Sequence, residues 1–215
     1  MSAAAIPPPA DIGGYRVLFV MAADAEYGEA LRRLIAPLFV GVGPVESAIN
    51  TTAALIAEKP HLVVSLGSAG SRSLEQGKVY QAASVSYRDM DASSLGFAKG
   101  CTPFLDLPAE VPLSLRIEGV PQARLSTGGA VISGGAYDQI DADMVDMESY
   151  AVVRACMRMH APVICLRGIS DGADELHHYD DWSRYLHVVD RNLAAVVDQL
   201  KSALVTGALF GSDSD

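Results

Sequence analysis

The stretch Leu62-Val63-Val64-Ser65-Leu66-Gly67-Ser68-Ala69-Gly70 decides the fold class, because it joins an apolar run to a group of small residues. The run from Leu62 to Leu66 is almost continuously apolar, as in strands that are covered on both faces. Three other stretches repeat the pattern, namely Val17–Met21, Leu38–Val40 and Val163–Leu166. We expect all four to be inner strands of a mostly parallel sheet.

Helical patterns lie between and after these strands. Apolar and small side chains recur at three- and four-residue spacing in three segments, and each spacing predicts a helix with one buried face. The stripes are Val45, Ala48, Ile49, Thr52, Ala53 and Ile56; Val152, Ala155, Cys156 and Met159; and Leu186, Val189, Leu193, Val196, Val197, Leu200 and Leu204. Residues 80–87 and 116–125 alternate more and are expected to be additional, partly exposed strands. The sequence therefore predicts a three-layer α/β/α fold with a central mixed, mostly parallel sheet.

The chain is long and apolar enough for one well-filled domain. It has 215 residues, of which 50% are hydrophobic and 20% are charged, so wholesale disorder is excluded. We place the domain at residues 15–206. Residues 1–14 are expected to be a flexible extension, because three consecutive prolines cannot join a helix or an inner strand, and residues 207–215 a frayed tail.

Charge and cysteine content restrict the partners. The formal net charge is −10, which disfavours binding to nucleic acid or to an anionic membrane surface. The three cysteines show neither CxxC nor Cys/His ligand spacing, so we expect no disulfide and no metal site. No stretch resembles a signal peptide or a membrane span. We therefore expect a cytoplasmic protein.

Small or acidic residues follow each apparent strand, at the edge of the sheet where α/β proteins bind ligands. Taken alone, Asp24 and Glu26 favour the dipole of a following helix, and residues 67–71 form a tight turn. Residues 41–43 supply two glycines of a dinucleotide-binding motif, but no acidic residue closes the next strand, so we reject NAD binding. A carboxylate at Asp171, flanked by apolar residues, would have a raised pKa and could act as an acid.

Three segments in this order and spacing resemble the nucleoside phosphorylase and nucleosidase superfamily, most closely the bacterial 5′-methylthioadenosine/S-adenosylhomocysteine nucleosidases. The segments are residues 63–70 with GSAG, Val145-Asp146-Met147-Glu148, and Arg167-Gly168-Ile169-Ser170-Asp171 followed by Ala173-Asp174. The resemblance implies hydrolysis of the bond between adenine and a 5′-thio-substituted ribose, with no metal or organic cofactor. This cleavage builds positive charge on the sugar and negative charge on the purine, so it needs an acid beside the base and a water-directing base beside the sugar.

The resemblance also implies a role for each matching residue. Asp171 would be the acid that protonates adenine, with Ser170 orienting its carboxyl group. Glu26 would hold and deprotonate the attacking water, and Glu148 would accept hydrogen bonds from the ribose hydroxyls. The other matches would line the pocket: Met147 on the sugar face, Ser68 and Arg167 on the water and ribose side, the backbone of Ile132 at the adenine edge, Leu95 and Phe97 beside the 5′ substituent, and Trp182 or Tyr185 closing it.

The chain departs from the family pattern in the first loop and beside the purine. At Val131 the family usually has an aromatic ring that stacks on the base, a contact worth about 1–3 kcal/mol per base in nucleic-acid binding. The assignment of Glu26 assumes an alignment without gaps from Val17, and Asp24 is the alternative. The resemblance further implies a homodimer in which a neighbouring subunit closes the 5′ pocket, and residues 101–105 are a candidate exposed apolar patch.

Two other functions stay open. A phosphate-dependent purine nucleoside phosphorylase needs fixed cationic donors for phosphate. Ser65 stands where related phosphorylases carry a phosphate-binding arginine, although Arg72 or Arg88 could supply one. A non-catalytic nucleoside-binding module is the second alternative. The adjacent His177 and His178 are expected in a surface loop near the pocket, because neighbouring side chains diverge and lack metal-ligand spacing.

Overall fold

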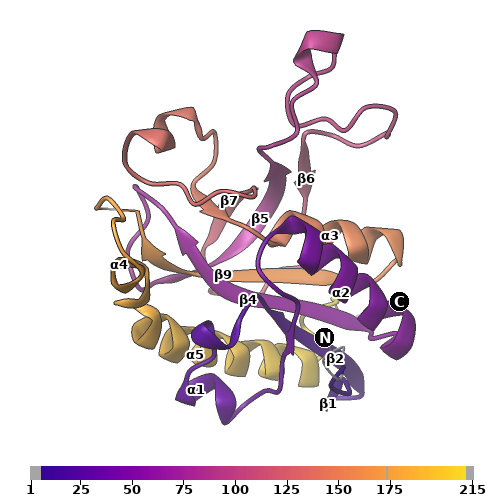
Figure 1. Ribbon diagram of the computed structural model, residues 1–215. Coiled ribbons are helices and arrows are strands. Elements are labelled where there is room, and N and C mark those ends of the chain that lie inside the picture. Colours follow the sequence, from indigo (N-terminus) through magenta and orange to yellow (C-terminus); the bar gives the residue numbers. More distant parts are fainter. Residues whose placement is uncertain (1–5, 173, 212–215) are drawn as a thin grey trace.

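The computed structural model describes residues 6–172 and 174–211, and its centre is a mixed sheet with helices on both faces (Figure 1). The strands of the described residues are β1 (Ala10–Ile12), β2 (Tyr15–Met21), β3 (Leu38–Phe39), β4 (Leu62–Gly70), β5 (Val79–Tyr87), β6 (Glu110–Pro112), β7 (Gln122–Thr127), β8 (Met144–Asp146) and β9 (Val163–Asp171). The α-helices are α1 (Glu29–Arg32), α2 (Pro44–Glu58), α3 (Ser149–Arg158), α4 (Tyr179–Ser183) and α5 (Leu186–Val205). Short 3₁₀ turns lie at Asp24–Glu26, Ser93–Leu95 and Gly134–Gln139.

The predicted mixed sheet is present, but its strand pairing closes on itself. β4 runs parallel to β2 and β9, β9 pairs antiparallel with β5, and β5 is parallel to β7. β8 then joins β7 in parallel and returns to β4 through an antiparallel pair, Gly70 with Val145. The sheet is therefore barrel-like around β4 and β9, and the expected three-layer α/β/α arrangement is not confirmed.

The two central strands are longer than the sequence predicts. Gly67–Gly70 and Arg167–Asp171 were expected as loops, yet they continue β4 and β9. The reason is mutual pairing, since Gly67 lies opposite Arg167 and Ser68 opposite Gly168, which keeps the backbone groups in the ladder. The register shifts only between Ala69 and Gly70. Ser68 and Asp171, which lie near the ends of these strands, therefore belong to hydrogen-bonded strands and not to loops.

The two long helices differ in how well their patterns predict burial. On α5 the whole predicted stripe is buried against β2, β4 and β9. On α2 the predicted stripe is wrong, because Val45, Ile49 and Ile56 are 68%, 58% and 58% exposed. The small side chains on the opposite face of α2 allow it to lie close to α3, and the buried residues there are Ser47, Thr51, Ala54 and Leu55.

Both predicted terminal segments contribute to the fold. Ala10–Ile12 was expected to be part of a flexible extension, but it pairs antiparallel with β2 as an edge strand, a position that tolerates the prolines before it. In the expected tail, Leu209 is 6% exposed and Phe210 stacks on Tyr15 with ring centroids 4.9 Å apart. Residues 1–5 and 212–215 lie outside the described residues. None of the described helices combines the length and apolar character that a membrane span requires.

Residues 80–87 and 116–125 were expected to be partly exposed strands, and each differs from that prediction. β5 is mostly buried, since it pairs with strands on both sides, and of 116–125 only the part from Gln122 is a strand. Between β5 and β6 the chain forms an arm that projects from the body (Figure 1). The predicted apolar patch lies on this arm, with Phe104 95% and Leu105 49% exposed.

Candidate active site

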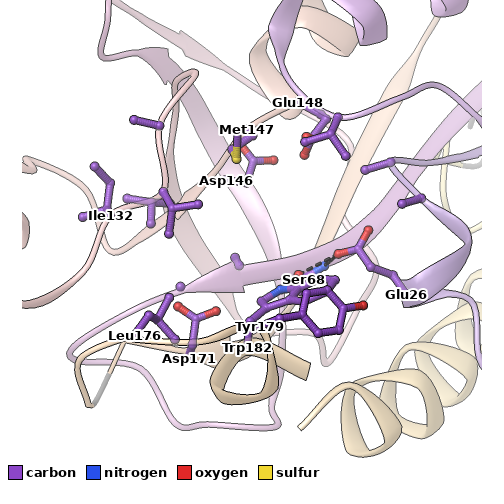
Figure 2. Close-up of a pocket in the computed structure, with 18 of the residues that line it drawn as sticks. Glu26, Ser68, Ile132, Asp146, Met147, Glu148, Asp171, Leu176, Tyr179 and Trp182 are labelled. Carbon is purple, nitrogen blue, oxygen red and sulfur yellow. Dashed lines mark hydrogen bonds between the residues drawn. The ribbon is translucent and has the colours of Figure 1, made fainter. Parts of the chain in front are cut away.

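A cavity of about 600 Å³ lies where β2, β4 and β9 end (Figure 2). Eight of the residues predicted from the resemblance line it: Glu26, Ser68, Val131, Ile132, Met147, Glu148, Asp171 and Trp182. Figure 2 shows Glu26 and Asp171 on opposite sides of the cavity, with Ser68 between them and Glu148 and Met147 across from Ser68. The fold therefore brings together three carboxylates that are far apart in the sequence.

Glu26 is the acid of the first loop that faces the cavity. Its side chain is buried, and Oε1 accepts hydrogen bonds from the backbone N–H of Ser68 at 2.7 Å and from Ser68 Oγ at 2.6 Å. Oε2 is buried and has no hydrogen-bond partner. Burial raises the pKa of Glu26, although both bonds from Ser68 act in the opposite direction. The alternative, Asp24, points away to pair with Arg32 at 2.5 Å.

The two glycines of GSAG are explained by the carboxylates that pass over them. A Cβ at Gly67 would lie 3.3 Å from both carboxylate oxygens of Glu26. A Cβ at Gly70 would collide with Tyr137 Oη and would lie 2.7 Å from Asp171 Oδ1. Three strand residues span about 10 Å, which leaves room for a ligand between the two acids. The GSAG segment thus lies directly beneath both carboxyl groups, and side chains larger than glycine at positions 67 and 70 would displace them.

Asp171 ends β9 with its carboxyl group in the cavity. Ser170 Oγ donates a hydrogen bond to Asp171 Oδ2 at 2.6 Å and so orients the carboxyl group. Ser170 itself does not line the cavity. Burial raises the pKa of Asp171, and the hydrogen bond from Ser170 opposes this shift. A carboxyl group in this position retains its proton to higher pH than an exposed aspartate.

Glu148 is held by the loop before α2. The backbone N–H of Gly43 donates to Glu148 Oε1 at 2.8 Å. Gly43 has φ +90°, a conformation that favours glycine, so the second glycine of residues 41–43 orients this donor. Burial, followed by the nearby charge of Asp146, raises the pKa of Glu148 to about 7. No pattern in the sequence indicates this contact between residues 41–43 and Glu148.

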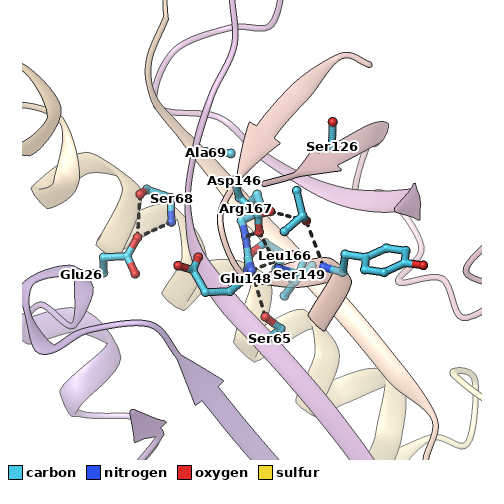
Figure 3. Close-up of polar contacts among 12 residues, drawn as sticks. Glu26, Ser65, Ser68, Ala69, Ser126, Asp146, Glu148, Ser149, Leu166 and Arg167 are labelled. Carbon is cyan, nitrogen blue, oxygen red and sulfur yellow. Dashed lines mark hydrogen bonds and ion pairs between the residues drawn. The ribbon is translucent and has the colours of Figure 1, made fainter. Parts of the chain in front are cut away.

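Arg167 lies beneath the cavity, so the prediction that it lines the water and ribose side is wrong (Figure 3). Its Nε pairs with Asp146 Oδ2 at 3.0 Å, and its Nη2 donates to Ser65 Oγ at 3.0 Å and Ser149 Oγ at 2.7 Å. Asp146 lines the cavity floor and also accepts from Thr127 Oγ1 at 2.6 Å. The long arginine side chain stays below because these buried acceptors satisfy it there.

Leu95 and Phe97 do not line the cavity, contrary to expectation. Both lie on the projecting arm, where Leu95 is 76% exposed and Phe97 contacts Phe104 edge to face at 5.5 Å. Val131 lines the cavity but is 67% exposed, and it offers no ring for stacking. Tyr185 also lies outside the lining.

The wall formed by α4 carries residues that the sequence indicated only loosely. Trp182 lines the cavity, and its Nε1 donates to Ser68 Oγ at 3.0 Å. Tyr179 lies beside it, with the two ring centroids 5.2 Å apart. His177 and His178 line the cavity mouth, as expected for a loop near the pocket. No cluster of three metal-ligating side chains occurs among the described residues.

Arg88 and Arg72, the two candidate phosphate ligands, are bound to acceptors within the protein. Among the described residues, Arg88 is the only arginine or lysine that lines the cavity. Its two terminal guanidinium nitrogens donate to the backbone carbonyls of Ser126, Asp146, Gly128 and Ala130, so it fixes the segment that leads to Val131, while its buried Nε has no partner. Arg72 lies outside the lining and pairs with Asp138 at 2.7 Å.

Known proteins resemble this chain in sequence and in fold. The 5′-methylthioadenosine/S-adenosylhomocysteine nucleosidase of Actinobacillus succinogenes is 32% identical over 165 residues, 68% of this chain and 72% of the relative. The enzyme of the same name from Staphylococcus aureus is 30% identical over 152 residues, 62% of this chain and 67% of the relative.

Solved structures share the fold at lower identity. The nucleosidase of the same name from Neisseria meningitidis, in complex with methylthio-immucillin-A, has a TM-score of 0.75 at 22% identity and covers 86% of this chain and 98% of its own. Futalosine hydrolase of Helicobacter pylori has a TM-score of 0.74 at 19% identity, with 86% and 97% covered. The sequence pattern of the phosphorylase superfamily matches residues 27–202. From this match and the sequence relatives, the chain belongs to the phosphorylase superfamily.

Proposed function

We propose that the chain hydrolyses the N-glycosidic bond of adenine nucleosides that carry a 5′-thio substituent, such as 5′-methylthioadenosine or S-adenosylhomocysteine. The observation that carries the proposal is the pair Glu26 and Asp171, two buried carboxyl groups with raised pKa on opposite sides of one cavity. An acid and a base separated by the width of a ligand suit the cleavage of a bond between a sugar and a base.

Glu26 acts on the water. Its Oε1 is fixed by the two hydrogen bonds from Ser68, while the buried Oε2 lacks a partner and is available to accept a proton from water. Water attacks the anomeric carbon as the bond to adenine breaks, and its proton passes to Glu26. The positive charge that develops on the sugar favours a nearby carboxylate.

Asp171 acts on the departing base. Burial raises its pKa and so favours the protonated form, and that proton passes to a ring nitrogen of adenine so that the base leaves neutral. Glu148 accepts hydrogen bonds from the ribose hydroxyls, and Met147 packs on the sugar face. Ile132 supplies backbone groups at the adenine edge, held in place through the contacts of Arg88 with the preceding segment.

Water is favoured over phosphate as the acceptor. A phosphate dianion needs free, fixed cationic donors. In the described part of the chain, Arg88 has the single guanidinium at the cavity wall. Both of its terminal nitrogens donate to backbone carbonyls, and its Nε is buried without access to the cavity. Ser65 stands at the position where related phosphorylases carry a phosphate-binding arginine. It is 2% exposed and accepts a hydrogen bond from Arg167, so it cannot bind phosphate in place of that arginine.

A non-catalytic binding module is also disfavoured. Burying carboxylates costs folding stability unless they are fully paired. Glu26 has one buried oxygen without a partner, and a protein that only binds a nucleoside gains nothing from this cost.

The test is chromatography of 5′-methylthioadenosine incubated with the protein, in phosphate-free buffer and again with added phosphate. We expect adenine and the free thioribose at equal rates in both tubes. Cleavage only with phosphate, with a sugar 1-phosphate as product, would replace the proposal with phosphorolysis. Binding without cleavage, measured by calorimetry in the same buffers, would leave the binding module.

We further propose that the chain works as a homodimer. The exposed apolar stripe of α2, which consists of Val45, Ile49 and Ile56, is continuous with Val42 at the cavity wall. Exposed apolar stripes of this kind commonly mark interfaces between proteins. A second copy on this face would also explain why Leu95 and Phe97 project from the body on the arm, since they would reach the 5′ end of the partner's cavity.

Sedimentation velocity tests the dimer. We expect a dimer for the wild type and a monomer for Ile49→Asp, because a buried charge opposes association. Ala57→Asp, on an exposed part of the same helix, is the matched control and should remain dimeric. A monomeric wild type at micromolar concentration would overturn the proposal.

We propose that residues 15–206 form one unit together with β1 and the packed residues Leu209 and Phe210, and that the protein is located in the cytosol. All three cysteines are free thiols, as is usual in a reducing compartment. Fractionation of the native cells, with antibody detection of the chain, tests the location.

A further inference from the structure

A chain of two hydrogen bonds connects α4 to the first loop across the cavity. The indole Nε1 of Trp182 lies 3.0 Å from Ser68 Oγ, and Ser68 Oγ lies 2.6 Å from Glu26 Oε1 (Figure 2). Trp182 comes from the C-terminal third of the sequence, whereas Ser68 and Glu26 both come from the first third. Glu26 and Ser68 were expected in the site from the family resemblance. That resemblance implies no hydrogen bond from Trp182 to either residue.

The chemistry of the three groups fixes the direction of both bonds. An indole N–H can only donate, and an ionised carboxylate can only accept. Ser68 must therefore accept from Trp182 and donate its single hydroxyl proton to Glu26. Without the indole N–H, the Ser68 hydroxyl has other orientations available, and its proton is no longer required to point at the carboxylate.

We propose that Trp182 is a positioning residue for Glu26, which acts by holding the Ser68 hydroxyl in its donor orientation. The inference rests on the proposed function, because it assigns Glu26 the task of directing water. A hydroxyl that accepts one hydrogen bond donates a stronger one, so Trp182 also strengthens the bond from Ser68 to Glu26. With Oε1 engaged in this way, Oε2 is the oxygen left for water.

The position of Trp182 on α4 makes the link conditional on that helix. α4 is short and follows the segment that carries His177 and His178 at the cavity mouth. Tyr179 packs edge to face on the indole at 5.2 Å and limits its rotation. Phenylalanine at position 182 would fill most of the same space without a donor, so the hydrogen bond can be removed with little change in packing.

Other charged groups near Glu26 remain unchanged in this substitution. On the cavity side these are Arg167, Asp146 and Glu148, and on the outer side Asp24 lies in the same 3₁₀ turn. A second cavity lies behind Glu26, and the charged or titratable groups that line it are Glu29, Arg33, His187, Asp190 and Arg191. A change in pH dependence on removing the indole N–H is therefore attributable to the bond to Ser68.

The first experiment is a double-mutant cycle on the pH profile of kcat/KM, with Trp182→Phe, Ser68→Ala and both together. We expect Trp182→Phe to lower kcat about three- to tenfold at neutral pH with little change in KM, the effect of one hydrogen bond. The acid limb should shift to higher pH, because the pKa of Glu26 rises when the bond from Ser68 weakens. In the Ser68→Ala background the same substitution should change neither quantity.

The second experiment needs no substrate, because Trp182 is the only tryptophan in the chain. Its fluorescence is recorded while pH is lowered from 8 to 4 in the wild type, Ser68→Ala and Glu26→Gln. We expect an emission change in the wild type as Glu26 takes up a proton, since a protonated carboxyl can donate to Ser68 and reorient its hydroxyl. Both variants should lack this transition.

The outcomes separate this inference from the proposed function. If the wild type releases no adenine, the proposed function fails while the fluorescence titration still decides the hydrogen-bond chain. If the wild type is active and Trp182→Phe lowers the rate equally with and without Ser68, Trp182 only fills space and the inference is overturned. An emission transition that persists in Glu26→Gln overturns it as well, even where Trp182→Phe fails to fold.

Discussion

Asp146 and Glu26 are both buried carboxylates beside the same cavity, with 6% and 8% exposure. Asp146 has donors on both oxygens: Thr127 on Oδ1, and Ser149 with Arg167 on Oδ2. Glu26 has both of its bonds on Oε1, and Oε2 has none. The number of partners therefore separates a carboxylate that supports the fold from one that is available for chemistry, whereas burial does not. Asp171, at 8% exposure, resembles Glu26 because only one of its two carboxyl oxygens accepts a hydrogen bond, in this case from Ser170.

The largest effect is expected from Asp171→Asn. An amide of the same shape cannot transfer the proton to adenine, so kcat should fall by about 10²–10⁴-fold, the usual contribution of general acid catalysis. Binding of an unreactive substrate analogue should be largely retained, since the side chain keeps its size and its contact with Ser170. Steady-state kinetics and calorimetry measure the two quantities. Unchanged turnover would show that another group protonates the base.

The converse is expected for Asp146→Asn, which should act mainly on stability. Removing the charge leaves Arg167 buried without its ion-pair partner, and the loss from breaking such a pair is about 3–5 kcal/mol of unfolding free energy. Urea denaturation monitored by circular dichroism measures this quantity. Glu26→Gln is the matched control at nearly equal burial, and it should leave stability unchanged or higher. Equal losses in the two variants would contradict the comparison.

Glu148→Gln should stabilise the protein above pH 7 by about 3 kcal/mol. Burial raises the pKa of Glu148 from an ordinary value of 4.5 to about 7 in the folded state. The folded state therefore binds the proton more tightly than the unfolded state, and stability falls as pH rises from about 4.5 to 7. The glutamine variant lacks this dependence, so the two proteins should differ at pH 8 and converge near pH 4. Thermal melts at both values measure the difference.

The sequence predicts those parts of the fold in which the local pattern and the tertiary environment agree. The stripe on α5 is buried as predicted, because the helix lies on the sheet through its most apolar face. The stripe on α2 is exposed, because α2 approaches α3 through small side chains such as Ser47 and Ala54. Apolar periodicity identifies the helix in both cases, but only the surroundings decide which face is covered.

The candidate site shows the same division. Residues near strand ends, such as Ser68 and Asp171, were expected from the family resemblance and do line one cavity. Arg167 was misplaced because the sequence does not show that Ser65 and Ser149 accept its hydrogen bonds below the floor. The link from Trp182 to Ser68 joins residues 114 positions apart, and no local signal could have indicated it.

The smallest effect is expected from Asp24→Asn, two residues from Glu26. Asp24 pairs with Arg32 at 2.5 Å, but the two side chains are 68% and 47% exposed, so the pair contributes at most about 1 kcal/mol. Unfolding free energy should change by less than that amount, and kcat/KM by less than about twofold, since Asp24 does not line the cavity. Glu26→Gln, measured in the same assay, should lose most of the activity. A loss in Asp24→Asn as large as that in Glu26→Gln would move the base by two residues, to a side chain that is mostly exposed. In that case the number of hydrogen-bond partners would no longer distinguish the reactive carboxylate from the others.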